Sequence, residues 1–401
     1  MGRRRRTSFH FLLMVSVVVK KTTPAKVVIA GGGVMGCSTA YCLAKNHGIS
    51  SVVVDRVGVA AAASGRAGGF LARSWNDGAP TQELTHRSFE LHAELGEELK
   101  AFAESGSTDY RRLTCEAVSV ASGGRPSNAK LKNVDWVDLG ALGSQHMGNE
   151  SGIAQVHPRK FCDALMRGAT ELAGSKTRVA RATGLRTEGN KVTGLVVDDG
   201  EVIEADAVVV ALGPWSHVVG RPPTETQCDT KGWGVDAMPP VVGTKYHAVL
   251  LQSPRVLSQA VFFQGMGDPE VYPRPDGEVY VTGFPERAAI VEDLPGETKV
   301  LDEVCDRLIS TIDQVSTELR GARVNGKQAC HLPAAPDGVP LIGAIPGLDG
   351  AFAATGHGCW GILLSPATGE AMADLIATGT ATKVDLSAFD PARYEGPRSF
   401  F

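Results

Sequence analysis

A glycine-rich turn between two apolar runs restricts the fold of this chain more than any other feature. The first run covers 26–30 and leads into Gly31-Gly32-Gly33-Val34-Met35-Gly36, and 35–45 then has the apolar face of a helix. The second run covers 51–55. A strand, a helix and a strand within about thirty residues predict a right-handed crossover between parallel strands. The chain is therefore expected to build the parallel sheet of an α/β protein.

The glycine turn has the spacing G-x-G-x-x-G, formed by Gly31, Gly33 and Gly36. In this pattern the first glycine allows a tight turn, the second lets the backbone approach a pyrophosphate, and the third allows close helix–strand packing. Asp55 follows Gly36 by 55 − 36 = 19 residues, where a carboxylate can accept hydrogen bonds from a ribose. We predict a dinucleotide site here, and the alternative is a glycine-rich turn that serves packing only.

Composition excludes several classes of partner. The chain has 401 residues, 43% hydrophobic and 21% charged, with a net charge of −4. These values are ordinary for a soluble globular protein, and they provide no basic field for nucleic acid. The eight cysteines are scattered without C-x-x-C pairs, so neither a disulfide framework nor a zinc site is expected. We predict a small-molecule substrate, no metal and no nucleic-acid partner; the oligomeric state is left open.

The first 25 residues differ from the rest of the chain. Arg3–Arg6 precede an apolar run over 9–19, which is too short to span a bilayer and is followed by no A-x-A cleavage site. Residues 1–25 are therefore interpreted as an N-terminal tail or a targeting segment. The expected location is cytoplasmic, with an organelle as the alternative if this segment is a presequence, and no integral membrane span is expected.

The spacing of apolar residues predicts the helices and strands of the remaining chain. Helices are expected over 81–104, 159–172, 297–320 and 363–378, and strands over 113–120, 178–212, 244–252, 270–282 and 351–355. The predicted fold is a doubly wound domain with a three-layer core, beside a second domain with a mixed, largely antiparallel sheet. We assign 26–75, 150–220 and 335–395 to the first domain, and 76–149 and 221–334 to the second, a cap over the substrate.

Three further glycine loops follow predicted strands, at 63–70, 211–216 and 354–361. Several such loops at strand ends indicate one extended cofactor contacted by backbone along its length. These segments resemble the FAD-dependent superfamily of D-amino-acid oxidase, glycine oxidase and sarcosine oxidase over about 26–395. The resemblance rests on the opening strand–helix–strand unit, Ser64-Gly65-x-x-Gly68-Gly69, Val156-His157-Pro158, Gly213-Pro214-Trp215-Ser216, Pro336-Asp337-Gly338-x-Pro340-x-Ile342-Gly343, Gly356-His357-Gly358-x-x-Gly361, Pro366-Ala367-Thr368-Gly369 and Asp385-Leu386-Ser387 through Arg393-Tyr394.

Two other segments, Tyr272 to Gly277 and Cys330 to Pro333, resemble a eukaryotic group of oxidoreductases whose substrate is poorly defined. The superfamily resemblance implies FAD as the cofactor. It places Gly31, Gly33 and Gly36 at the pyrophosphate and Asp55 at the ribose. It further places Ser64 and Gly65 at the diphosphate and ribityl chain, Gly68 and Gly69 near the flavin, Ala182 at the adenine, and Gly356, Gly358 and Gly361 beside the isoalloxazine. The full cofactor set also includes Val34, Met35, Arg56, Gly213, Trp215, Cys330 and His357.

The resemblance also implies a reaction, in which an amine or amino acid is oxidised by hydride transfer to flavin N5 with O₂ as the default acceptor. Glycine and D-amino-acid oxidases carry a substrate-binding arginine where this chain has Leu332. Arg274 could substitute for it or be a structural arginine. His357 is the other catalytic candidate, and it could equally serve to position the loop.

Two departures leave alternatives open. The strand at 278–282 lacks the lysine that sarcosine oxidases use with oxygen. Cys330 stands where monomeric sarcosine oxidase links its flavin, so it could form a thioether or be an inert buried thiol. The alternatives to an oxidase are a flavin-bound trafficking or binding factor with little catalysis, and an NAD-dependent dehydrogenase.

Overall fold

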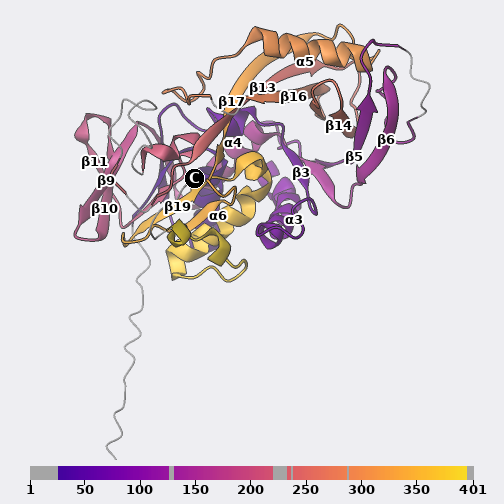
Figure 1. Cartoon of the computed structure of the whole chain (residues 1–401). Coiled ribbons are helices and arrows are strands. Elements are labelled where there is room, and N and C mark those ends of the chain that lie inside the picture. The colour runs from indigo at the N-terminus through magenta and orange to yellow at the C-terminus, as the bar shows by residue number, and fades with distance from the viewer. Residues whose placement is uncertain (1–25, 126–130, 220–232, 236–237, 287–288, 395–401) are drawn as a thin grey trace, which may run out of the picture.

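The computed structural model describes residues 26–125, 131–219, 233–235, 238–286 and 289–394 (Figure 1). Residues 1–25, interpreted above as a tail or targeting segment, lie outside this part of the chain. No helix in these ranges is long and apolar enough to cross a membrane. No group of three or more His, Cys, Asp or Glu side chains in them is arranged to hold a metal ion.

A six-stranded sheet forms the centre of the structure and confirms the predicted α/β fold. Its strand order is β18-β19-β12-β1-β2-β8, parallel throughout except for the β18–β19 pair at one edge. The strands are β1 (Val27–Ala30), β2 (Ser51–Asp55), β8 (Lys176–Val179), β12 (Ala207–Val210), β18 (Leu341–Ala344) and β19 (Ala351–Thr355). Every residue of β1, β12 and β19 is buried, because both faces of the sheet are covered.

Helices cover one face of this sheet and a small β-meander covers the other. The helices are α1 (Val34–His47), α2 (Ala63–Arg66), α3 (Gln82–Glu98), α4 (Pro158–Ala173) and α6 (Gly361–Thr378). Val27 and Ile29 pack among them, whereas Val28 and Ala30 pack against the meander of β9 (Ala182–Glu188), β10 (Lys191–Val197) and β11 (Val202–Glu204). The alternation along β1 therefore produces three layers, which Figure 1 shows with β9–β11 opposite α6.

A seven-stranded sheet forms the second large unit, in the order β17-β13-β16-β15-β14-β5-β6. Its neighbours are antiparallel except for the β5–β14 pair. The strands are β5 (Thr114–Val120), β6 (Ala141–Gly148), β13 (Val242–Gln252), β14 (Gln259–Gln264), β15 (Glu270–Pro273), β16 (Glu278–Glu286) and β17 (Val324–Ala334). Helix α5 (Asp302–Val315) covers one face of this sheet (Figure 1).

The other face of the large sheet is lined by aromatic side chains. It packs against a three-stranded sheet of β3 (Phe70–Ala72), β4 (Arg111–Arg112) and β7 (Ile153–Gln155), with Tyr272 and Tyr280 contributing to the shared core. The single-turn helices are η1 (Leu99–Ala101), η2 (Asp198–Gly200), η3 (Gly213–Val218), η4 (Gly358–Trp360), η5 (Ser387–Phe389) and η6 (Pro391–Tyr394).

The structure corrects several predicted elements. The helix expected over 297–320 is only Asp302–Val315, because the chain turns at Ser316, whose hydroxyl donates to the carbonyl of Trp136. Strands β6, β14, β17 and β18 were not predicted from the sequence. Most of the loop expected over 220–240 lies outside the described residues.

Candidate functional site

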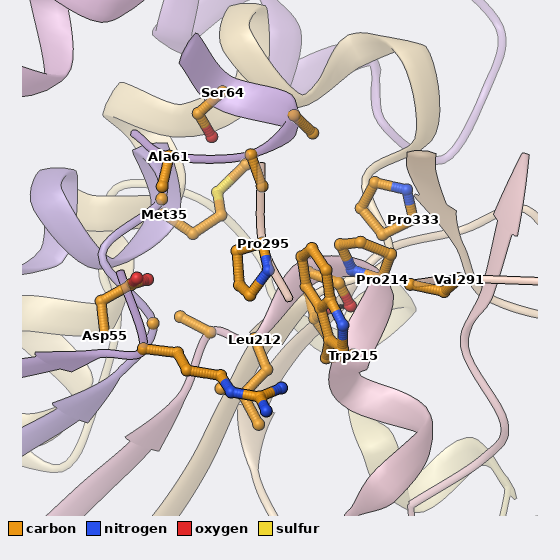
Figure 2. Close-up of a pocket in the computed structure, with 18 of the residues that line it drawn as sticks. Met35, Asp55, Ala61, Ser64, Leu212, Pro214, Trp215, Val291, Pro295 and Pro333 are labelled. Atoms are coloured by element: carbon orange, nitrogen blue, oxygen red, sulfur yellow. Dashed lines mark hydrogen bonds between the residues drawn. The ribbon is translucent and has the colours of Figure 1, made fainter. Parts of the chain in front are cut away.

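A pocket of about 1000 Å³ lies where β1, β2, β12 and β19 end and where α1 and α6 begin. In doubly wound sheets this edge is where ligands bind. Thirteen residues predicted from the sequence line it: Gly31, Gly33, Val34, Met35, Asp55, Arg56, Ser64, Ala182, Gly213, Trp215, His357, Gly358 and Gly361. Figure 2 shows Met35, Asp55 and Ser64 on one side, Trp215, Pro214 and Pro333 on the other, and Pro295 between them.

The glycine turn leaves an open cradle at the start of α1. Gly31 has φ +115°, and a Cβ there would clash with the carbonyl of Ala211, so this glycine is required by the backbone itself. Gly33 differs, because a Cβ added to it would meet only the Ser64 hydroxyl, at 3.2 Å. That hydroxyl accepts a hydrogen bond from the Val34 amide at 2.9 Å. The space beside Gly33 belongs to the pocket, and it fits the close approach of a pyrophosphate.

The Asp55 carboxylate is fixed at the end of β2 by three backbone donors. Its Oδ2 accepts from the Gly32 amide at 2.8 Å, and its Oδ1 accepts from the amides of Val57 and Gly58, both at 2.9 Å. These bonds hold the carboxylate in one orientation at the pocket wall. This geometry fits a partner that donates hydroxyl hydrogens, such as the ribose of a dinucleotide.

Two helices direct their N-termini at the same pocket. Helix α1 begins at Val34 and α6 at Gly361, and neither helix is capped by the side chain of its own N-cap residue, although the Val34 amide donates to the Ser64 hydroxyl. The amide donors and the positive end of each helix dipole therefore face the cavity, which favours a ligand with negative charge at both places.

His357 lies just before η4 and is 4% exposed. Its Nε2 is 3.2 Å from the Thr368 hydroxyl on α6. Burial lowers the pKa of this imidazole to about 3. The side chain is therefore neutral, and its hydrogen bond ties the loop at the pocket to the helix behind it.

Seven predicted residues are not among those that line the pocket: Gly36, Gly65, Gly68, Gly69, Gly356, Cys330 and Arg274. For three glycines the reason is a close backbone contact. A Cβ on Gly36 would clash with the carbonyl of Gly31, one on Gly65 with that of Ala60, and one on Gly69 with that of Val156. Gly68 instead faces the ring of Tyr272. These glycines shape the loops behind the pocket wall.

The two reactive side chains in this group are both enclosed. Cys330 is 5% exposed, and burial raises the pKa of its thiol to about 11, so the sulfur is protonated. A thioether at Cys330 stays a hypothesis. Arg274 is 4% exposed, forms an ion pair with Glu278, and donates to the Ala67 carbonyl at 3.3 Å. Because its guanidinium is already engaged away from the pocket, the arrangement favours the structural alternative over a substrate clamp.

One wall of the pocket was not predicted from the sequence. It is formed by residues 289–297, which we call the strap. Ile290, Val291, Glu292, Asp293 and Pro295 of the strap line the cavity. The strap has no helix or strand periodicity. The one feature of the strap that could have indicated a role is the acidic pair Glu292-Asp293, because neighbouring residues in the sequence offer these carboxylates no basic partner.

Four side chains outside the strap hold it across the pocket. The Asp293 carboxylate lies 2.5 Å from the Arg56 guanidinium and 3.5 Å from that of Arg181. The Trp215 indole N–H donates to the Glu292 carbonyl at 2.9 Å, and the Glu292 carboxylate lies 2.7 Å from His331 Nε2. The strap is thus fastened at both sides of the cavity.

A doubly wound sheet with this glycine turn, a fixed strand-end acid and a long pocket defines a dinucleotide-binding protein. A family model described as FAD dependent oxidoreductase (DAO) matches residues 26–375, and the chain belongs to this family. FAD is therefore the cofactor. The alternative of an NAD-dependent dehydrogenase is set aside.

Relatives with known names agree with this family. Glycine oxidase of Pseudomonas putida is 28% identical over 90% of this chain and 96% of its own length. The protein C1F5.03c of Schizosaccharomyces pombe, an oxidoreductase by name, is 27% identical over 90% of this chain and 96% of its own. The crystal structure of glycine oxidase from Geobacillus kaustophilus superimposes with a TM-score of 0.74, at 22% identity, over 94% of this chain and all of that chain.

Replacing Asp293 by alanine is expected to speed the release of FAD about 3- to 10-fold. The substitution removes two exposed ion pairs, each worth about 0.2–1 kcal/mol. It leaves Arg181 without its strap partner, whereas Arg56 keeps only its hydrogen bond to the backbone carbonyl of residue 293. The measurement is the rate at which an apoflavoprotein trap captures FAD from the purified protein. Added KCl should speed release from the unmodified protein more than from the variant, since exposed ion pairs are screened.

The matched control is Glu188→Ala, which removes an exposed carboxylate on β9 outside the pocket lining. It should leave the release rate unchanged. Equal release rates for the Asp293 variant and the unmodified protein would show that the strap does not limit the exchange of FAD.

Proposed function

We propose that this oxidoreductase oxidises a small molecule at a carbon that bears an amine, with FAD extended along the pocket. Support comes from one observation above all: two helix N-termini and a fixed carboxylate face one cavity in the order that a dinucleotide requires. In this arrangement the cradle at Gly33 and Val34 holds the pyrophosphate and Asp55 the ribose. Residues 180–183 then lie at the adenine, and residues 358–361 beside the isoalloxazine.

The same proposal assigns one role to each of the two predicted domains. Residues 26–75, 150–220 and 335–395 hold the cofactor. Residues 76–149 and 221–334 form a cap over the substrate, apart from α3, which packs among the helices of the first unit. When bound, FAD supplies the acceptor for two electrons and a proton from the substrate carbon. The chain supplies orientation, exclusion of water and the positive end of the α6 dipole, which favours negative charge on the reduced cofactor.

Within this proposal His357 acts as a neutral positioning residue. Its hydrogen bond to Thr368 fixes the loop at 356–361 against α6. An imidazole with a pKa near 3 cannot deliver or take a proton as its cation in the physiological range.

Protein stability should therefore fall as the pH drops below about 6.5, where an unfolded histidine begins to take up a proton. The folded protein keeps His357 neutral down to about pH 3, so the unfolded state binds more protons between these values and gains free energy. His357→Gln should reduce the loss of unfolding free energy between pH 6.5 and pH 4.5 by about 2 kcal/mol. Urea unfolding of both proteins across this range measures the difference, and an unchanged loss in the variant would contradict a buried neutral imidazole.

An anaerobic screen tests the proposed reaction. The purified holoprotein is mixed with single amines and amino acids, and the visible absorbance of the flavin is followed. Bleaching by an amine-bearing compound, with release of the matching aldehyde or oxo acid, supports the proposal. A colourless protein that takes up no FAD, or a flavin that no amine reduces, would overturn it.

Two observations favour a second candidate function, a flavin-bound binding or trafficking factor with little catalysis. Leu332 lines the pocket where the related amino-acid oxidases have their substrate arginine, and strand β16 carries no lysine. The same screen separates the two candidates, because a binding factor keeps its flavin oxidised with every amine.

A further inference from the structure

Six aromatic rings gather between the seven-stranded sheet and the loop at the start of α6, and we call them the aromatic cluster. The members are Phe70 on β3, Trp75, Phe262 on β14, Tyr272 on β15, Tyr280 on β16 and Trp360 on η4. The ring centroids of Trp75 and Phe262 are 5.0 Å apart, those of Phe70 and Tyr272 are 5.2 Å apart, and those of Trp75 and Trp360 are 6.3 Å apart. The cluster is thus a continuous surface.

Four members of the cluster lie at the edge of a core. Tyr272 and Tyr280 are buried in that core, whereas Phe70, Trp75, Phe262 and Trp360 are only half-buried. Trp360 directly follows Gly358 and Cys359, which line the pocket. Under the proposed function, on which this inference rests, these rings lie at the isoalloxazine end of the cofactor, where a substrate must be held.

Glu270 carries the one carboxylate of the described residues that lies within this cluster. On the sheet it pairs directly with Phe262 on β14 and with Thr282 on β16. The Tyr272 hydroxyl donates a hydrogen bond to it. The side chain is half-buried, and no lysine, arginine or histidine of the described residues forms an ion pair with it. Its enclosed surroundings raise the pKa of the carboxyl, and a cation placed beside it would favour the ionised form.

The nearby arginines do not offer a site for a carboxylate. Arg274 is paired with Glu278, and Arg111 donates to the carbonyls of Leu257 and Pro273. Arg66 likewise donates to the carbonyls of Ala329 and Gly296. The Arg274 guanidinium already lies 5.7 Å from the centroid of the Tyr280 ring. The half-buried rings Phe70, Trp75, Phe262 and Trp360 and the Glu270 carboxylate therefore remain for a ligand.

We propose that Glu270 and the aromatic cluster form the subsite for the substrate's ammonium group, and that the substrate class is an alkyl- or arylalkylammonium recognised without an α-carboxylate. Cations are attracted to the faces of Trp, Tyr and Phe rings, more strongly where water is excluded. A carboxylate in the same enclosed place adds a charge-assisted hydrogen bond. The carbon chain of the substrate then lies against the exposed parts of Phe70, Phe262 and Trp75.

Binding of three matched probes to the oxidised holoprotein tests the subsite. The probes are benzylammonium, phenylacetate and benzyl alcohol, which share a ring and differ in charge, and the readouts are the flavin difference spectrum and titration calorimetry. Benzylammonium should bind at least about 10-fold more tightly than phenylacetate, the effect of one charge-assisted contact of about 1.4 kcal/mol. Glu270→Gln should remove this preference while leaving the affinity for benzyl alcohol within about two-fold.

Three further variants test whether the result is specific to the subsite. Trp75→Leu should weaken benzylammonium and Trp75→Phe should restore it, because only the second keeps a π-face. Glu188→Gln, which neutralises an exposed carboxylate on β9, should change nothing. Flavin content and thermal unfolding of each variant establish that the protein is intact.

The outcomes separate this proposal from the proposed function. Equal or tighter binding of phenylacetate, or no effect of Glu270→Gln on benzylammonium, overturns the subsite, even if amino acids reduce the flavin. Binding of benzylammonium that depends on Glu270 supports the subsite, even if no amine reduces the flavin.

Discussion

Replacing Gly33 by alanine is expected to lower the affinity for FAD roughly 100-fold while the protein stays folded. The added methyl group meets only the Ser64 hydroxyl, at 3.2 Å, and otherwise occupies pocket space. Gly33 does not have a positive φ, so alanine adopts its backbone conformation without strain. The methyl group would hold the pyrophosphate away from the amides at the start of α1. Losing one or two hydrogen bonds to a charged group, at about 1.5–3 kcal/mol each, accounts for the expected change.

The measurement is the flavin content after purification, followed by titration of the apoprotein with FAD. Thermal unfolding of the apo form should stay close to that of the unmodified apoprotein. Gly152→Ala is the matched control, because a Cβ there meets nothing within 4 Å and the residue lies outside the pocket lining. Unaltered FAD affinity in the Gly33 variant would show that the pyrophosphate does not lie at this turn.

The unit around Gly33 could be predicted because its determinants are local in the sequence. The apolar runs of β1 and β2, the turn between them and Asp55 all lie within 26–55, and the pairing of β1 with β2 follows from their connection. The same holds for β19 and α6, where a buried strand leads through a glycine loop into a helix. Patterns of this kind specify both the fold and the pocket edge that the fold creates.

Sequence could not tell which glycines face a ligand and which face backbone. Gly33 and Gly65 stand in equally glycine-rich loops, yet only Gly33 borders the pocket, and Gly65 is required because a side chain would clash with the carbonyl of Ala60. The difference depends on how 60–65 folds back on itself. This is a property of tertiary structure, with no counterpart in spacing.

The strap and the aromatic cluster were missed for a related reason. Phe262 and Glu270 become neighbours only through the register of β14 against β15, and β14 in turn pairs with β5, far earlier in the chain. Asp293 meets Arg56 across 237 residues. Pairings of this range depend on the assembled sheets, so no local pattern could have indicated them.

The second large effect is expected where α1 and α6 cross. Gly369 on α6 faces Ser38 on α1, and a Cβ on Gly369 would lie 2.6 Å from the Ser38 carbonyl carbon and from its Cβ. The obstacle is helix backbone, which cannot move aside as a flexible side chain can. Both helices begin at the pocket, at Val34 and Gly361, so their packing also sets the relative position of the two N-termini.

Gly369→Val is therefore expected to destabilise the protein by about 3 kcal/mol through overpacking and to lower its melting temperature by roughly 4 °C. Thermal and urea unfolding of the apoprotein measure the change, and excess FAD should recover only part of it, since the displaced helices no longer present their amides together. Asn46→Val places the same side chain at an exposed position of α1 and should have little effect. If the Gly369 variant unfolds like the unmodified protein, the two helices have room to separate, and close packing between them does not position the two ends of the cofactor site.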